Sequence, residues 1–256
     1  MQFIAPTLLA ALAAVAVAEN DAIFSLFDDE AFIAEEGAAA PKKKKQPRGP
    51  PKCDEKKYLE AQRNYYTSMG LPAVVSGRAY ARKVKALIQG DGIDGHRTLA
   101  KNFLAYWKEL EDSGDLGCLY CPVNLKKLGY PVSRIKEVLI RTAVQLVNSM
   151  NVELLASDYS CYVKSSVDTF AEVLPGIYRY YFALLRGRGN CRSAMGFASS
   201  VTALYKKECG AGVAQYVYGK IGTPLFYSYP RCRWPPLVPK EQDKKRRQLQ
   251  QFAAFA

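Results

Sequence analysis

The chain of 256 residues contains a single histidine, His96, and no arrangement of residues that is typical of an active site. One imidazole excludes histidine-rich metal cages and gives little basis for a histidine-dependent nucleophile. The sequence has no P-loop, no GxSxG motif and no glycosidase-like pair of acids, and the GxG at residues 187–189 stands alone. We therefore predict a protein that is not an enzyme, with no catalytic residues and no metal site. We expect His96 at an exposed helix start.

Basic residues are missing from the first 40 positions, which hold seven acidic residues. Met1–Ala18 is apolar and ends in small residues, which resembles the core and cleavage site of a targeting signal. Its length is marginal for a membrane span, which needs about 20 apolar residues. We expect residues 1–40 to be a targeting and acidic segment that is removed or disordered, so that the mature protein has no membrane span. A retained helix, buried or lying on a membrane, is the alternative.

The other 216 residues carry 36 Lys and Arg against 17 Asp and Glu, a formal charge of +19. Residues 41–52 (PKKKKQPRGPPK) form a Pro-rich basic tether that cannot bury a core. This surplus of positive charge favours an acidic protein partner. Nucleic acid or anionic lipid would also attract it, particularly through Lys42–Lys45 and the basic run at 244–247. No base-reading motif accompanies these runs, so we expect no nucleic-acid partner.

Strand patterns are scarce, whereas apolar residues recur at helical spacing through most of the chain. We predict an all-α fold with an irregular helical body over residues 53–222 and extended N-terminal and C-terminal arms. The basic C-terminal arm is expected to cover 223–256. Predicted helices cover residues 54–69, 77–88, 98–110, 133–155, 162–173, 175–185, 191–209 and 212–218.

The body also shows a weak internal two-fold repeat, with halves at about 53–130 and 158–222. Each half contains, in the same order, a cysteine, a pair of tyrosines, a Gly-Arg dipeptide, a helix and a second cysteine. The cysteines at these positions are Cys53, Cys118, Cys161 and Cys209.

The sequence has seven cysteines, an odd number that leaves at least one thiol over if the others pair. Behind a targeting segment, this number first suggests disulfides. Cys118 and Cys121 form a CxxC motif. As a zinc half-site it lacks a second pair of ligands, and as a redox motif it lacks a preceding βαβ pattern.

An acidic side chain lies near each of the four repeat cysteines: Asp54, Asp115, Asp158 and Glu208. A thiolate can add to a linear tetrapyrrole to form a thioether, a carboxylate can pair with the protonated pyrrole nitrogens, and Arg can bind the propionates. Aromatic rings on both sides would hold such a pigment extended. Each site taken alone is equally compatible with a plain buried thiol.

With Gly77–Arg82 (GRAYAR), the helix after it, the Gly117-Cys118 pair and the basic composition, these cysteines resemble the γ subunits and related chromophore-bearing linkers of red-algal phycobilisomes. The resemblance covers residues 53–218. It implies a linker that sits in the cavity of acidic phycoerythrin α/β hexamers, organises the rod with other linkers and transfers excitation energy. The implied cofactor is phycourobilin or phycoerythrobilin, and the implied location is the chloroplast, at the stromal face of the thylakoid membrane. The body is short for a γ subunit, and the N-terminus is not Ser- or Arg-rich as plastid transit peptides often are.

The resemblance also implies site residues. Bilin attachment is expected at Cys53, Cys118, Cys161 and Cys209, and a second or additional attachment at Cys121, Cys191 and Cys232. The pyrrole and propionate partners would be Asp54, Asp115, Asp158, Glu208, Arg78 and Arg188.

Two other hypotheses use the same features. A secreted, disulfide-stapled helical interaction protein accounts for the cysteines and the signal-like start, and a basic nucleic-acid or membrane-binding module accounts for the charge. Several tyrosines and arginines could contact a partner protein. Alternatively, the tyrosines would pack in the core and the arginines would form a solvated basic face. These residues are Tyr65, Tyr66, Tyr178, Tyr180, Tyr181, Arg179, Arg186 and Arg188.

Overall fold

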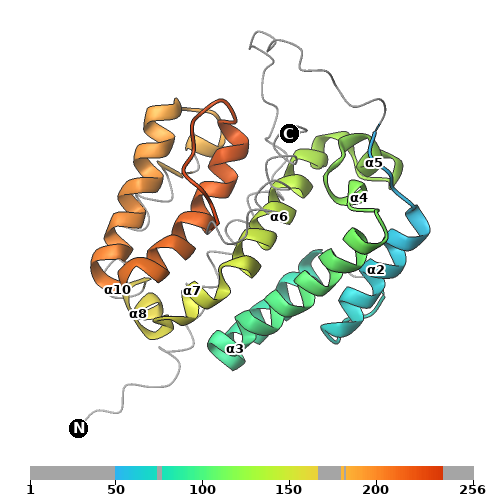
Figure 1. Ribbon diagram of the computed structural model, residues 1–256, viewed down its shortest axis with the longest axis horizontal. Coiled ribbons are helices and arrows are strands. Elements are labelled where there is room, and N and C mark those ends of the chain that lie inside the picture. The colour runs from blue at the N-terminus through green and yellow to red at the C-terminus, as the bar shows by residue number, and fades with distance from the viewer. Residues whose placement is uncertain (1–49, 74–76, 167–179, 182, 239–256) are drawn as a thin grey trace.

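The computed structural model describes residues 50–73, 77–166, 180–181 and 183–238. These residues form helices joined by short turns and contain no strand, which confirms the predicted all-α fold. The predicted segment 1–40 and most of the tether lie outside the described residues. The helix α6 (Val132–Met150) runs obliquely between two groups of helices (Figure 1). On one side lie α2 to α5, within residues 55–127, and on the other lie α8 (Tyr159–Lys164) and α10 (Cys191–Ser228).

The first helix of the body, α2 (Glu55–Ser68), begins after an N-cap that the sequence provides. The side chain of Asp54 accepts hydrogen bonds from the backbone N–H groups of Lys56 and Lys57, which would otherwise lack partners in the first turn. The helix buries Tyr58, Ala61 and Tyr65 against the rest of the body. A predicted helix over 54–69 is thereby confirmed.

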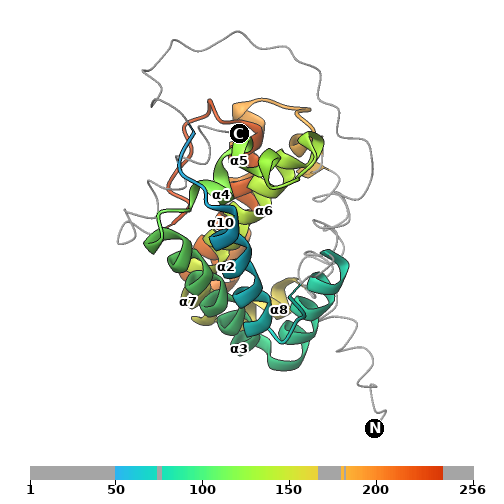
Figure 2. The same ribbon diagram turned by 90° about the vertical axis from the view of Figure 1, so that its right-hand side faces the viewer.

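The next helix, α3 (Gly77–Asp112), bends sharply at Gly92, where φ is 55° and ψ is −124°. The sequence predicts two helices separated by Gly90–Gly92, and the structure confirms a break at that place. Just after the bend, the backbone of Gly95 lies so close to Leu87 that a Cβ atom there would come within 2.2 Å of the Leu87 carbonyl oxygen. The two limbs of α3 leave the bend in different directions (Figure 2).

Two short helices, α4 (Gly117–Tyr120) and α5 (Pro122–Lys127), lead to α6 (Val132–Met150) and α7 (Val152–Ala156). The single helix predicted over 133–155 is therefore wrong, because Asn151 interrupts it with φ −101° and ψ 6°. The Asn151 side chain is buried there and donates a hydrogen bond to the Leu237 carbonyl at 3.1 Å. A tertiary contact thus ends the helix where the apolar pattern alone would continue it.

Helix α8 (Tyr159–Lys164) precedes α10 (Cys191–Ser228), which breaks at Gly210 with φ 82°. The predicted gap between helices at 209 and 212 is confirmed, and the two limbs of α10 lie beside one another (Figure 1). The predicted helices over 162–173 and 175–185 fall mostly on residues 167–179, which lie outside the described residues.

The prediction of an extended C-terminal arm from residue 223 is wrong for residues 223–228, which belong to α10. Pro224 would ordinarily end a helix, but the helix continues because Leu225 and Tyr227 are buried in the core, at 0% and 3% exposed. The Thr223 hydroxyl also donates to the Gly219 carbonyl at 2.6 Å, in the turn where Pro224 contributes no backbone N–H. The irregular segment begins after Tyr229 and returns along α10, where it buries Leu237 and Val238.

The buried side chains form a larger and a smaller core. The larger core lies around α6, whose Leu139, Ala143 and Leu146 are at most 1% exposed, and it reaches α2, α3 and α10. The smaller core is formed by α7, α8 and α10 and consists of Leu155, Tyr162, Tyr205, Cys209, Val213, Ala214, Tyr216 and Val217. The internal repeat remains a prediction.

Candidate functional site

Six cysteines of the described residues form disulfides, and they include all four predicted attachment positions. Cys53 bonds to Cys118, and Cys161 to Cys209. The third bond joins Cys191 and Cys232, while Cys121 is a buried free thiol. A sulfur in a disulfide cannot hold a thioether at the same time. Bilin attachment at these six residues therefore requires the bonds to be open, and it remains a prediction.

The structure brings Asp54 and Asp115 together beside the Cys53–Cys118 disulfide. Asp115 is fully buried, and its Oδ1 accepts a hydrogen bond from the Asp54 backbone N–H at 2.9 Å. The exposed ammonium of Lys52 lies 3.7 Å from the same oxygen. One predicted pyrrole partner therefore caps a helix, and the other holds the backbone at the start of that helix.

Asp158 and Glu208 lie near the Cys161–Cys209 disulfide in a similar way. Asp158 is the N-cap of α8, and its carboxylate accepts from the Cys161 backbone N–H at 3.1 Å. Glu208 precedes the bonded Cys209 and pairs with Lys207 at 3.9 Å. These contacts are what helix ends and an exposed ion pair ordinarily provide, so they do not require a pigment.

The predicted arginines do not join these clusters among the described contacts. Arg78 is the second residue of α3, and its side chain lies outside the described residues, whereas Arg188 is exposed in the loop before α10. The predicted contact tyrosines divide: Tyr65 and Tyr181 belong to the core, and Tyr180 is 47% exposed. Tyr178 and Arg179 lie outside the described residues.

His96 lies in the first turn of the second limb of α3, four residues after the break at Gly92, so the predicted helix start is confirmed. The predicted exposure is wrong, because the side chain is half-buried. Its ring packs edge-on against Tyr159, with 5.7 Å between centroids. Burial, together with the nearby Lys220 cation, lowers the pKa of His96 to about 4. The imidazole is therefore neutral near pH 7.

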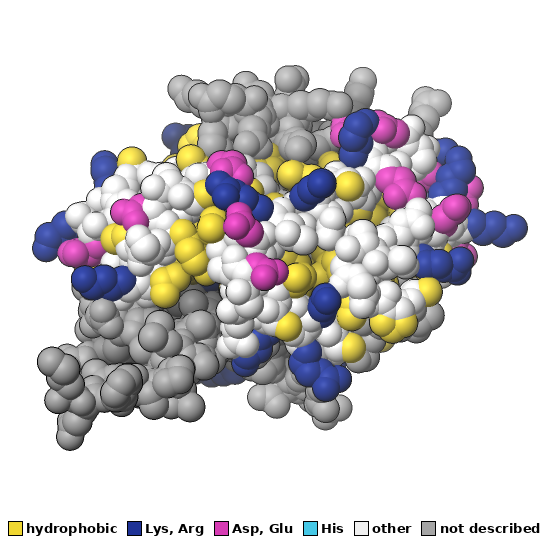
Figure 3. All heavy atoms as spheres, turned by 90° about the horizontal axis from the view of Figure 1, so that it is seen from below, with side chains coloured by type: hydrophobic (Ala, Val, Ile, Leu, Met, Phe, Trp, Pro, Cys, Tyr) yellow, Lys and Arg dark blue, Asp and Glu magenta, His cyan; other side chains and the backbone are white. Residues whose placement is uncertain are grey.

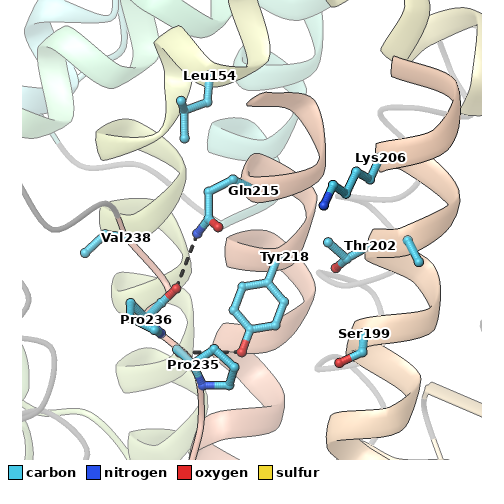
Figure 4. Close-up of a pocket in the computed structure, with 10 residues that line it drawn as sticks. Leu154, Ser199, Thr202, Lys206, Gln215, Tyr218, Pro235, Pro236 and Val238 are labelled. Atoms are coloured by element: carbon cyan, nitrogen blue, oxygen red, sulfur yellow. Dashed lines mark hydrogen bonds between the residues drawn. The ribbon is translucent and has the colours of Figure 1, made fainter. Parts of the chain in front are cut away.

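One described feature that can take a ligand is an open groove of about 610 Å³ between the two limbs of α10. Ser199, Thr202 and Lys206 project from the first limb, and their spacing of three and four residues puts them on one helix face. Gln215 and Tyr218 come from the second limb (Figure 4). The volume falls in the range of small-molecule sites, about 300–1,000 Å³.

The other walls of the groove are mostly apolar. Leu154 of α7 closes one end, and the C-terminal segment contributes Pro235, Pro236 and Val238. Besides the Asn151–Leu237 bond, the Gln215 side chain donates to the Pro236 carbonyl of that segment at 3.3 Å, and the Tyr218 hydroxyl donates to the Pro235 carbonyl at 3.5 Å. The bonds from Gln215 and Tyr218 are visible in Figure 4. The groove is therefore built from three segments that lie far apart in the sequence.

Lys206 is the only cation among the described residues that line the groove, and its ammonium points toward the space between the limbs (Figure 4). It makes no ion pair with any described residue, whereas the adjacent Lys207 pairs with Glu208. Ser199 and Thr202 place hydroxyl groups on the same wall. The site thus combines apolar walls with one positive charge and the hydroxyls of Ser199, Thr202 and Tyr218.

Two of the disulfides hold the groove at its ends. Cys191, the first residue of α10, bonds to Cys232, which lies three residues before Pro235. Cys209, three residues after Lys206, bonds to Cys161 of α8. The first limb of α10 is therefore crosslinked to a neighbouring segment at each end.

The surface carries both signs of charge. On the face drawn in Figure 3, Lys and Arg side chains alternate with Asp and Glu, and neither sign forms one continuous patch. Within the described ranges, no helix is long and apolar enough to cross a membrane, and no group of three or more His, Cys, Asp or Glu could hold a metal ion.

Helices, three disulfides and an open groove define a disulfide-crosslinked all-α protein with a candidate ligand site. Comparisons with protein-family models, with curated proteins and with solved structures found no match to this chain.

The sequence analysis did not identify the groove residues. The spacing of Ser199, Thr202 and Lys206 is a signal for a shared helix face. No local pattern, however, indicates that the chain turns back at Gly210 and brings Tyr218 opposite that face. The pairing of cysteines 41 to 65 residues apart is likewise set by the tertiary fold.

Proposed function

We propose that the chain is a secreted, disulfide-stapled helical interaction protein, and that it binds an amphipathic anion in the groove of α10. The observation that carries this proposal is the position of two disulfides, Cys161–Cys209 and Cys191–Cys232, at the two ends of the groove. Disulfides persist in oxidising compartments, which agrees with the signal-like Met1–Ala18.

The chemistry of the lining supports the ligand class. The apolar walls favour an alkyl or aromatic group, because its burial removes apolar surface from water. The Lys206 ammonium and the Ser199 hydroxyl favour a carboxylate at one end, through charge-assisted hydrogen bonds. The Thr202 hydroxyl donates to the Ala198 carbonyl at 2.7 Å, so it is not counted as a donor to the ligand. A site that is already ordered before binding costs less conformational entropy when the ligand binds, and the two crosslinks hold this groove in its shape in the free protein.

Calorimetric titration of the oxidised full-length protein with dodecanoate tests the proposal. We expect saturable binding that weakens at least about tenfold in Lys206→Met, since one charge-assisted contact contributes about 1.5–3 kcal/mol. Lys207→Met is the matched control, because Lys207 is the neighbouring exposed cation and does not line the groove. Absence of binding, or equal weakening in both variants, contradicts the ligand assignment.

The colour of the protein and the chemical state of its cysteines distinguish this proposal from the hypothesis of a pigment-bearing linker. We expect a colourless protein from the natural source, whose six cysteines appear as three linked peptide pairs in a non-reducing digest. Visible absorption that survives denaturation, together with bilin-modified cysteine peptides, would replace the interaction protein with the phycobilisome linker.

A further inference from the structure

The free thiol Cys121 lies one helical turn from a cysteine that is already bonded. Cys118 belongs to α4, and Cys121 follows its last residue. The Cys121 backbone N–H donates to the Gly117 carbonyl at 3.2 Å, so the helical turn is closed through Cys121. Helical geometry puts the Cα atoms of residues three apart at about 5 Å. Disulfides span Cα distances of about 4.4–6.8 Å.

The Cα atom of Cys118 therefore lies at a distance that a disulfide can span from the Cα atoms of two cysteines. Its present partner, Cys53, has its Cα atom 5.0 Å away. Cys118 is 0% exposed and Cys121 is 2% exposed, so both cysteines are buried. Cys53 is only half-buried and stands where the basic tether enters the body.

We propose that Cys53, Cys118 and Cys121 form a thiol–disulfide exchange site that releases the Cys53 thiol. The Cys121 thiolate attacks the Cys118 sulfur, the Cys118–Cys121 bond forms, and the Cys53–Cys118 bond breaks. Cys53 leaves as a thiolate and takes up one proton, which balances the proton that Cys121 gave up to solvent. One disulfide replaces another, so no oxidant or reductant is consumed.

The exchange alters the crosslink without requiring α2 to leave the body. The Asp54 N–H still has Asp115 as acceptor at 2.9 Å, and the Lys52 ammonium still reaches the Ser113 carbonyl at 3.1 Å. The half-buried Cys53 thiol then becomes available to a disulfide-bearing partner, by the same exchange chemistry. In the starting state the free thiol is the buried Cys121, and in the product it is the half-buried Cys53.

Asn124 holds the segment before Cys53, the leaving cysteine, against α4. Its side-chain NH₂ donates to the Pro51 carbonyl at 2.9 Å and to the Gly117 carbonyl at 3.0 Å, which ties the segment before Cys53 to α4. The contact is tight, because a Cβ atom on Gly117 would lie 2.4 Å from the Lys52 carbonyl oxygen. Loosening this tie, as in Asn124→Ala, should speed the exchange.

The test follows Cys53 in the oxidised full-length protein without added oxidant or reductant. The protein is held at pH 8 or pH 6, quenched with acid, alkylated with N-ethylmaleimide and mapped by mass spectrometry without reduction. We expect alkylated Cys53 and a Cys118–Cys121 disulfide to accumulate together, faster at pH 8 because the thiolate is the attacking species. Asn124→Ala should increase the rate severalfold, and Cys121→Ser should abolish the alkylation of Cys53.

The other two disulfides are the internal control, and they should stay intact. A second variant, Cys53→Ser, keeps the proposal testable if Cys121→Ser fails to fold. Treated with oxidised glutathione, it should form Cys118–Cys121 and lose both alkylation sites. The proposal is overturned if Cys53 stays unalkylated at pH 8, if all three disulfides scramble together, or if Cys118 and Cys121 of Cys53→Ser remain separately alkylated.

Discussion

At the scale of single residues, Asp115 shows how a buried charge is used to hold a backbone. Its carboxylate is fully buried, accepts the Asp54 N–H and lies near the Lys52 ammonium, while its Oδ2 has no hydrogen-bond partner among the described residues. Leaving a buried donor without an acceptor costs about 1–3 kcal/mol. The role of Asp115 is therefore to fix the start of α2 beside the Cys53–Cys118 disulfide.

We predict that Asp115→Ala lowers the free energy of unfolding by about 1–3 kcal/mol, because the Asp54 N–H loses its acceptor. Asp115→Asn keeps an acceptor oxygen and should cost less. Urea denaturation followed by circular dichroism measures both. Asp94→Ala is the control, since that side chain is 75% exposed and its removal should change stability by less than about 0.5 kcal/mol. A loss in Asp115→Ala no larger than in the control would contradict the role of Asp115.

His96 gives a second prediction at this scale, and as the only histidine it has a unique NMR signal. Burial and then the Lys220 cation lower its pKa to about 4 in the folded protein, against 6.5 in an unfolded chain. Between pH 6.5 and 4 the unfolded chain therefore binds a proton that the folded protein does not, so stability falls as the pH falls. The contribution is fully present above pH 6.5.

Titration of the imidazole resonances should give a midpoint near 4. In His96→Gln, the part of the stability loss between pH 6.5 and 4 that comes from His96 should disappear, while the loss from carboxyl groups stays. A midpoint near 6.5 would show that the ring is solvated and would contradict its packing against Tyr159.

At the scale of elements, two glycines of α3 that look alike in the sequence have opposite roles. Gly95 lies where the limb after the bend passes Leu87, with no room for a methyl group, whereas nothing lies within 4 Å of a Cβ atom on Gly90. Neither position has a positive φ, so the difference comes from packing alone.

We predict that Gly95→Ala destabilises the protein by at least about 2 kcal/mol, because its Cβ would lie 2.2 Å from the Leu87 carbonyl oxygen and the backbone would have to move. Gly90→Ala should raise stability by up to about 1 kcal/mol, through the higher helix propensity of Ala. Thermal and urea unfolding of this matched pair check both signs. If the two variants behaved alike, the close approach at the bend would be ruled out.

The same elements show what the sequence could and could not predict. The breaks at Gly92 and Gly210 were predictable, because glycine conformation is local. The sequence analysis placed Asp54 at the start of a helix but assigned it to a pigment, not to the cap that the structure shows. The interruption at Asn151 was not, because it depends on Leu237, which lies 86 residues away. The cysteines could be recognised as a set, but their partners depend on how the helices pack. The groove required the relative placement of α7, both limbs of α10 and the C-terminal segment, which no local pattern contains.

At the scale of the whole molecule, the two cores depend on crosslinks to different degrees. The larger core joins α2, α3, α6 and α10 through many buried apolar side chains. The smaller core draws on the short helices α7 and α8 and on part of α10, and it includes the bonded Cys209. A short helix contributes little apolar surface, so the smaller core relies more on the Cys161–Cys209 crosslink.

We predict that the double variant Cys161→Ser/Cys209→Ser loosens the smaller core while the larger core persists. In the chain-entropy model, a crosslink that closes 48 residues stabilises the folded state by about 4 kcal/mol. Amide hydrogen exchange should show faster exchange in α8 and in α10 near Tyr205 and Val213, with α6 protected as before. Cys191→Ser/Cys232→Ser is the comparison, because it frees the C-terminal segment beside the groove and should leave α8 protected. Equal loss of protection in α6 and α8 would mean that the two cores unfold as one unit, and that the crosslink stabilises the whole body instead of one end of it.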